Sequence, residues 1–360
     1  MPVVSLRRAL SGIGCVAALG LLGCSAPAQP ASSAPAAPPA AAQAASAASA
    51  ASGTAAAPAP TPWASALTKV RLSYPGTSLG ALPVFVAQAE DFYRRYGLDV
   101  DAVQMAPNVA MTAMTTGEVP YSMAIGSCIS SALKGLPIKV TMQTTDAPYV
   151  FLVTRPEIKA AADLRGKTIG TASRGNANDV VMRLMLRKQG LEPERDVAMV
   201  VIGETAVTFE SMRAGIIDAA PLSPPWVQEG QKIGFNVLMA GADAVDLPMG
   251  GVGTSHAKLE QERDEVVRMI MANLEAQRFI RENREGTVDV IMQRLELDRD
   301  TAGAAYDSLR SIFGPGDLQR SGLEAAVNTE IELGNIDKAP PLEDIADFTI
   351  VPEARRRLGW

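Results

Sequence analysis

Histidine and cysteine are nearly absent from this chain, and their scarcity removes several kinds of chemistry. The only histidine is His256, and the three cysteines are Cys15, Cys24 and Cys128. No HExxH, CxxC or clustered His/Cys segment provides the ligand spacing of a transition-metal site, so we expect no metal and no cofactor. Since Cys15 lies in an N-terminal leader and Cys24 is the expected lipid anchor described below, Cys128 has no partner for an intramolecular disulfide. We expect it to be a small buried apolar residue.

Clustered positive charge is also missing. The formal net charge is −6, and removal of the leader takes away Arg7 and Arg8 but no acidic residue, which leaves −8. The one basic run that remains is 355–357, so phosphate neutralisation by a nucleic-acid-binding surface is not expected. Neither G-x-x-x-x-G-K-[ST] nor G-x-G-x-x-G occurs, because Gly251-Val252-Gly253 lacks the third glycine. These gaps exclude the usual nucleotide folds.

What the chain does have is an export signal at its start. Arg7 and Arg8 form a positive region, 9–20 is an apolar run of small residues, and Leu21-Leu22-Gly23-Cys24 resembles a lipobox. The apolar run is too short to span a bilayer, which takes about 20 residues. We expect residues 1–23 to be a signal peptide, with cleavage before Cys24 and lipid on its thiol and new amino group. The alternative is an ordinary signal peptide with an incidental cysteine.

A tether follows the proposed anchor. Residues 25–62 are almost entirely Ala, Pro, Ser and Gln, with no charged or aromatic residue before Trp63. Such a segment buries too little apolar surface to offset its ordering entropy. We therefore expect residues 24–62 to be a lipidated cysteine followed by a disordered tether, which keeps a globular body near a membrane. An O-glycosylated or unused spacer is the other interpretation.

From Trp63 onward, short β-forming runs alternate with helical patterns. The expected strands are 70–74, 98–105, 121–124, 138–144, 149–154, 167–171, 196–202, 217–222 and 235–239. The main expected helices are 82–96, 109–116, 127–133, 179–189, 257–285 and 300–313. Strands separated by helices of this length predict an α/β fold with parallel sheets covered on both faces.

Four stretches in this α/β part resemble a known family. They are AEDFYRRYGLDVD at 89–101, GEVPYSMA at 117–124, DLRGKTIG at 163–170 and AGIIDAAP at 214–221. In this order they resemble type II periplasmic substrate-binding proteins, in the branch for nitrate, taurine, alkylsulfonates and thiamine-pyrimidine precursors. The third stretch is the most specific. Pro120 departs from the pattern, because the branch usually has Asp there.

The resemblance implies a two-lobed, Venus-flytrap fold with two crossover segments and a helical C-terminal part. Residues 63–147 and 251–360 would form a discontinuous first lobe, and 148–250 a second lobe that includes the crossovers. Together with the N-terminal pattern, it predicts a monomeric, membrane-anchored solute-binding lipoprotein, periplasmic or at the cell surface. Its partners would be a small-molecule ligand, the ABC permease in the inner membrane and, through Cys24, the lipid bilayer.

Most candidate binding residues lie between a strand and the following helix, because helix N-termini at the carboxyl edge of a parallel sheet attract anions. The turns are Gly76–Gly80, Gly126–Ser127, Ser173–Asn176 and Ser223–Trp226. The candidate ligand-binding residues are Thr77, Ser78, Leu79, Gly126, Ser127, Asp146, Tyr149, Ser173, Arg174, Gly175, Asn176, Ser223 and Trp226. Arg174 would grip an acidic group on the ligand. Tyr149 and Trp226 would supply apolar walls, and Asp146, by the first crossover, would receive an amine or cap a turn. Each turn also has a plainer interpretation as a helix cap without a ligand.

Two other functions stay open on the sequence. Gly76-Thr77-Ser78-Leu79-Gly80 fits the nucleophile elbow G-x-S-x-G, so a serine hydrolase using Ser78 is a remote alternative. It would have to use His256 as its base, although that residue opens a predicted helix capped by Ser255. A lipoprotein that senses a ligand for a membrane receptor would have the same lobes. The favoured interpretation is a non-enzymatic carrier of a small anionic or heteroaromatic nutrient, such as a sulfonate, nitrate, carboxylate or pyrimidine.

Overall fold

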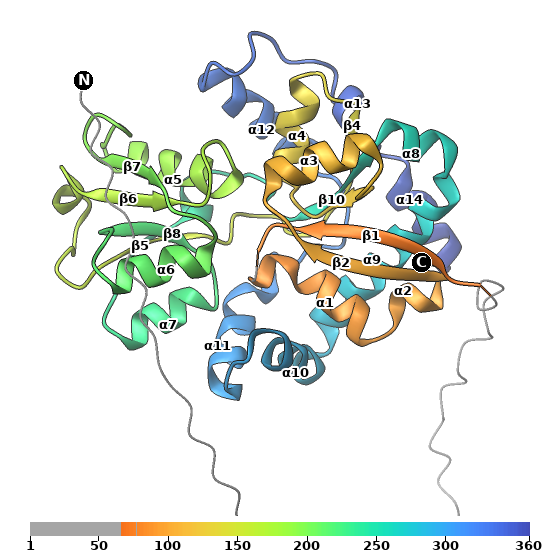
Figure 1. Cartoon of the computed structure of the whole chain (residues 1–360), viewed down its shortest axis with the longest axis horizontal. Helices are drawn as coiled ribbons and strands as arrows, with labels where there is room; N and C mark the ends of the chain where they lie inside the picture. The colour runs from red at the N-terminus through yellow and green to blue at the C-terminus, as the bar shows by residue number, and fades with distance from the viewer. Residues whose placement is uncertain (1–65, 77) are drawn as a thin grey trace, which may run out of the picture. The chain divides into compact units, whose positions relative to one another are not determined.

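The computed structural model describes residues 66–360 apart from residue 77. The predicted signal peptide, Cys24 and the tether therefore lie outside the described residues, as does Thr77. The described part contains two five-stranded sheets flanked by helices (Figure 1). The α/β class predicted from the alternating pattern is confirmed.

The first sheet has the strand order β2-β1-β3-β10-β4. Its strands are β1 (Thr68–Tyr74), β2 (Leu98–Gln104), β3 (Tyr121–Ser122), β4 (Ile138–Gln143) and β10 (Gly251–Ser255). The helices between its first four strands are η1 (Leu79–Ala81), α1 (Leu82–Ala89), α2 (Phe92–Arg95), α3 (Pro107–Thr116) and α4 (Ile125–Leu133). β1 runs parallel to β2 and β3, whereas β10 is antiparallel to β3 and β4.

The second sheet has the order β7-β6-β8-β5-β9. Its strands are β5 (Phe151–Thr154), β6 (Thr168–Thr171), β7 (Ala198–Val201), β8 (Ala219–Leu222) and β9 (Asn236–Ala240). Its helices are η2 (Ala161–Leu164), α5 (Ala177–Lys188), α6 (Thr205–Arg213), α7 (Trp226–Lys232) and η3 (Gly241–Asp243). β6 is parallel to β7 and β8, and β5 is antiparallel to β8 and β9.

Both sheets are mixed, which corrects the expectation of parallel sheets. The exceptional strands are β5 and β10, and each is the first strand that the chain forms after passing from one sheet to the other. Phe151 pairs with Leu222 at the carboxyl end of β8, and Gly251 pairs with Gln143 at that of β4. A chain that enters a sheet at the carboxyl edge of its neighbours has to run antiparallel to them.

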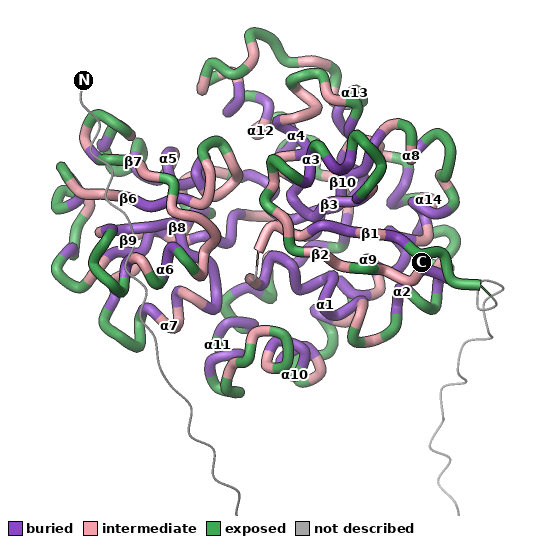
Figure 2. The backbone as a smooth tube through the Cα atoms, viewed as in Figure 1, coloured by how far each residue is buried: buried purple, intermediate pink, exposed green. Residues whose placement is uncertain are grey.

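The rest of the chain is helical and packs mainly on the first sheet. It comprises α8 (His256–Gln261), α9 (Arg263–Glu282), α10 (Arg284–Leu295), α11 (Arg299–Leu309), η4 (Arg310–Ile312), α12 (Arg320–Glu332), α13 (Leu342–Ile345) and α14 (Ile350–Leu358). α9 contacts α1, α2 and α14 and buries Val266, Ile270 and Ile280. Figure 2 shows that β3 and β10 are buried, whereas the outer helices carry exposed residues.

Two expected helices are interrupted. The predicted helix 82–96 divides into α1 and α2, because Asp91 adopts the left-handed conformation with φ of 54°. The predicted helix 257–285 divides into α8, α9 and the start of α10, with breaks at Glu262 and Asn283. Ser255 caps α8 as predicted, since its side chain accepts a hydrogen bond from the Lys258 amide. No helix in the described part of the chain is both long and apolar enough to cross a bilayer.

Cys128 is fully buried between α4 and β10, as expected from its isolation in the sequence. Burial raises the pKa of its thiol to about 12, so the group stays protonated at neutral pH. Gly253 of β10 lies directly opposite: a Cβ placed on it would be 2.5 Å from the Cys128 Sγ atom. The glycine therefore permits the close packing of helix on strand.

We predict that Gly253→Ala lowers the free energy of unfolding by about 1–3 kcal/mol, because the added methyl group overpacks this contact. Urea unfolding measures the change. In a Cys128→Ala background the same substitution should cost clearly less, since the sulfur is gone. An equal cost in both backgrounds would show that the strain arises elsewhere.

Candidate functional site

In each sheet, two of the parallel strands lead from their carboxyl ends into a helix. In the first sheet, β1 leads to η1 and β3 leads to α4; in the second, β6 leads to α5 and β8 leads to α7. Parallel strands put their carboxyl ends at one edge of a sheet, where open α/β folds bind ligands. The helices that begin there expose unpaired N–H groups and a partial positive charge.

A cavity of about 170 Å³ lies at these helix starts. Its walls come from turns of both sheets and from the two crossover segments, which contribute Tyr149 and Met249. Its polar lining residues in the described chain are Ser78, Ser127, Tyr149, Ser173, Asn176, Asn178, Glu204, Thr205 and Ser223. Alanines, prolines and glycines form most of the remaining wall, which suits a small solute held mainly by shape and a few polar groups.

Many of the residues proposed from the sequence meet in this cavity. They are Ser78, Gly126, Ser127, Tyr149, Ser173, Asn176 and Ser223. Two of them also cap helices, as the plainer interpretation expected: Ser78 accepts from the Gly80 amide and Asn176 from the Asp179 amide. Lining and capping are therefore compatible, and ligand binding by these residues stays a prediction.

Other proposed residues lie outside the cavity lining. Leu79 is fully buried beneath the first turn, and Gly175 lines a smaller neighbouring cavity. The Trp226 ring packs on Phe209 with 5.3 Å between ring centroids. Asp146 accepts a hydrogen bond from Gln143 at 3.3 Å, and burial raises the pKa of its carboxyl group. Their roles in binding also stay predictions.

Arg174 is held by an ion pair at the rim of the second sheet. Its Nη1 atom lies 2.8 Å from Glu194 Oε1, and its side chain is 68% exposed. Arg183 binds the same carboxylate oxygen at 3.0 Å. Hydrogen bonding from Arg183, reinforced by the charges of both arginines, lowers the pKa of Glu194. In this arrangement the Arg174 guanidinium neutralises Glu194 and does not line the cavity.

Sequence reasoning missed the turns after β2 and β7. They bring Ala106 and Pro107, at the start of α3, and Glu204 and Thr205, at the start of α6, into the cavity wall. Both turns follow expected strands, so the rule used for the other four turns would have found them. Glu204 is the important omission, since it introduces a carboxylate.

The turns of the two sheets touch each other directly. The Leu79 amide donates to the Pro224 carbonyl oxygen at 3.4 Å. A Cβ on Gly126 would lie 3.1 Å from the Ala177 Cβ, so α4 and α5 also meet closely at their starts. Lys232 of α7 pairs with Asp298, which caps α11, at 3.5 Å. In the described conformation the turns of the two sheets are therefore in contact, and the cavity lies between them.

The sheet topology separates the residues of the remote hydrolase alternative. Ser78 follows the carboxyl end of β1, at the cavity. His256 follows the carboxyl end of β10, where Thr254 pairs with Tyr121 and Gly253 with Ser122 in antiparallel register. Because β3 is parallel to β1, His256 lies at the opposite edge of the sheet from Ser78. This arrangement gives Ser78 no histidine base.

Comparison with known proteins identifies a family and several relatives that this chain resembles. A model of the NMT1-like family matches residues 64–295. The nitrate/nitrite binding protein NrtA of Nostoc sp. is 25% identical over 262 residues, which cover 63% of this chain and 58% of that protein. The riboflavin-binding protein RibY of Chloroflexus aurantiacus is 27% identical over 253 residues, 66% of this chain and 69% of that protein.

A solved structure shows the same fold. The alkanesulfonate-binding protein SsuA from Xanthomonas axonopodis pv. citri, bound to MOPS, superimposes with a TM-score of 0.65 at 16% identity. The match covers 80% of this chain and 98% of the SsuA chain. The predicted periplasmic-binding-protein fold is thereby confirmed.

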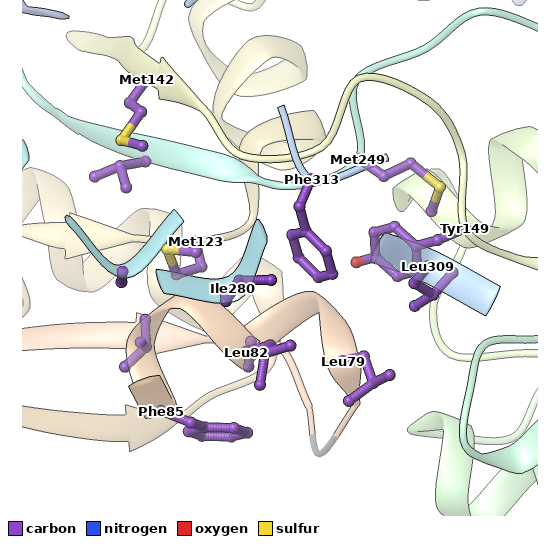
Figure 3. Packing of buried hydrophobic residues seen from close by; sticks show 14 of the residues in the cluster. Leu79, Leu82, Phe85, Met123, Met142, Tyr149, Met249, Ile280, Leu309 and Phe313 are labelled. Carbon is purple, nitrogen blue, oxygen red and sulfur yellow. The ribbon is translucent and has the colours of Figure 1, made fainter. Parts of the chain in front are cut away.

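Tyr149 supports the wall of the cavity by packing on the first turn. Its ring lies against Gly80, so that a Cβ on this glycine would collide with the hydroxyl group and lie 2.8 Å from Cζ. Figure 3 shows the ring among Leu79, Leu309, Phe313 and Met249. Burial raises the pKa of the Tyr149 hydroxyl to about 12, so it remains a neutral phenol.

We predict that Gly80→Ala displaces Tyr149 and lowers the free energy of unfolding by about 1–3 kcal/mol, as overpacking does. Chemical denaturation measures it. Gly76→Ala is the matched control in the same turn, because the nearest atom to its Cβ would be Glu204 Oε2 at 3.5 Å. The control should stay within about 0.5 kcal/mol of the wild type. Equal losses in both variants would contradict the proposed contact.

Proposed function

The chain belongs to the NMT1-like family, and we propose that it is the solute-binding protein of an ABC importer. The observation that carries the proposal is the cavity lined by turns from both sheets and by the crossovers. The names of its relatives, which bind nitrate, riboflavin and alkanesulfonates, support a small anionic or heteroaromatic solute. No covalent chemistry is required of the chain, because binding alone performs the task.

The mechanism follows from the position of the cavity. A solute that contacts both sheets has more interactions in the closed arrangement than in an open one. It therefore shifts the population toward the closed form by its differential affinity. We infer that the two crossovers are the hinges and that residues 63–147 with 251–360, and 148–250, are the two lobes. The permease would then recognise the closed form.

We also propose where the protein works. The N-terminal pattern supports export, cleavage before Cys24 and lipid attachment at that residue, with 24–62 as the tether. The body would then act as a monomer on the outer side of the inner membrane, held near the permease by its anchor. A solute released into the permease would be driven inward by the importer's ATPase.

The first test is ligand binding. Native mass spectrometry of freshly purified protein should find a retained solute, and thermal-shift screening should cover sulfonates, nitrate, aromatic carboxylates and pyrimidines. At 100 times its Kd, the solute should add about 2.7 kcal/mol and raise the Tm by about 5 °C or more. A complete absence of binding would contradict the proposal.

The binding site predicted from the sequence can be tested in the same thermal-shift assay. We predict that the double variant Ser127→Ala/Arg174→Ala loses the thermal shift, because it removes a lining hydroxyl and the proposed acid-binding guanidinium. The single variants divide the loss between the two residues. Arg213→Ala, which removes an exposed arginine paired with Glu210, is the control and should keep the full shift. A shift that persists in the double variant would move the site elsewhere.

A separate prediction concerns the anchor. Cys24→Ala should move the protein from the membrane fraction to the soluble fraction, because the lipid attachment site is lost. Cell fractionation and mass spectrometry of the mature N-terminus measure this. Cys15→Ala, within the signal peptide, should leave the protein in the membrane fraction. If Cys24→Ala also remains there, the protein is not anchored by a lipid at this residue.

A further inference from the structure

The cavity carries a charge pattern that narrows the class of solute. Among its described lining residues there is no lysine, arginine or histidine, and Glu204 is the one charged side chain. Arg174, the cation expected here, is paired with Glu194 outside the lining. A simple anion in this cavity would face a carboxylate with no formal positive charge beside it.

The Glu204 carboxylate is directed away from its own helix. It occupies the N-cap position of α6, yet its side chain makes no capping hydrogen bond to that helix. Its Oε2 atom instead accepts a hydrogen bond from Gln104 Nε2, at the end of β2 in the other sheet. In the described part of the chain no cationic side chain lies within 4.0 Å of it.

This geometry leaves acceptor capacity for a ligand. An ionised carboxylate has about four lone-pair positions, and the hydrogen bond from Gln104 uses one of them. Gln104 is neutral, so the negative charge is not balanced by its partner. A hydrogen bond to a carboxylate is strongest when the donor is itself cationic or is one of several N–H groups.

Resting on the proposed solute-binding function, we propose that the solute carries an ammonium or amino group that donates to Glu204, so that the site selects amine-bearing solutes over simple anions. The helix starts on the other walls, at Ser127 of α4 and Asn178 of α5, receive the acceptor end of the same molecule. The solute class is then a small zwitterion or an amino-substituted heterocycle. Closure joins Glu204 to Gln104, so binding of the amine and closing of the sheets act on the same side chain.

Matched pairs of compounds test this selection by isothermal titration calorimetry on the full-length mature protein. Taurine and isethionate differ by ammonium against hydroxyl, and cytosine and uracil differ at an amino group; nitrate serves as the simple anion. We expect the amine-bearing member of a pair to bind the wild type about tenfold or more tightly than its partner. Glu204→Gln should remove this preference and strengthen nitrate binding. Glu210→Gln, on the exposed side of the same helix, should preserve it.

The outcomes separate this inference from the proposed function. If isethionate, uracil or nitrate binds as tightly as the amines, or if Glu204→Gln keeps the preference, the protein binds solutes but the role of Glu204 is wrong. If no probe binds, the solute retained through purification decides: one without an N–H or cationic group overturns the inference. If nothing binds and nothing is retained, the proposed function fails as well.

Discussion

The close approach of two sets of turns is the constraint on which the whole arrangement depends. Leu79 donates from the first sheet to Pro224 in the second, and Gly126 meets Ala177 where α4 and α5 begin. Backbones approach this closely only where side chains are absent or small. A bulky residue at Gly126 or Ala177 would hold the starts of α4 and α5 apart. Small residues here are therefore a condition for closure, in addition to forming the cavity wall.

The antiparallel strands β5 and β10 place supporting residues beside this close approach. Because β5 and β10 enter their sheets at the cavity edge, the crossover segments bring Tyr149 and Met249 into the cavity wall. Tyr149 then packs against Gly80 of the first turn. Leu309 and Phe313 from the C-terminal part lie beside its ring (Figure 3). The helical C-terminal part thus supports the turns from below, although no described residue from it lines the main cavity. Motion at the crossovers would carry the tyrosine with them.

The sequence predicted the parts of this architecture that depend on local pattern. Strand and helix alternation located most elements within a few residues, and turns after β1, β3, β6 and β8 were assigned to the site. The break at Asp91 was missed because a non-glycine residue in the left-handed conformation leaves no clear signal. The direction of β5 and β10 was missed because it depends on how the chain passes between sheets, which is a tertiary property. Likewise, the partner of Arg174 is Glu194, twenty residues away, and no local spacing indicated that pair.

Electrostatics distinguishes two interpretations of the cavity. In one it binds a simple anion, and in the other it binds a solute that has an acceptor at one end and a donor at the other. Helix starts carry about half a positive charge each, and they attract the acceptor end of a solute. Glu204 stands at such a start itself, so its carboxylate more than cancels the partial charge of α6 and makes that wall negative. The walls at α4 and α5 have no comparable side-chain charge in their lining. A solute with an acceptor at one end and a donor at the other satisfies both walls, whereas a simple anion satisfies only one and is repelled by the other.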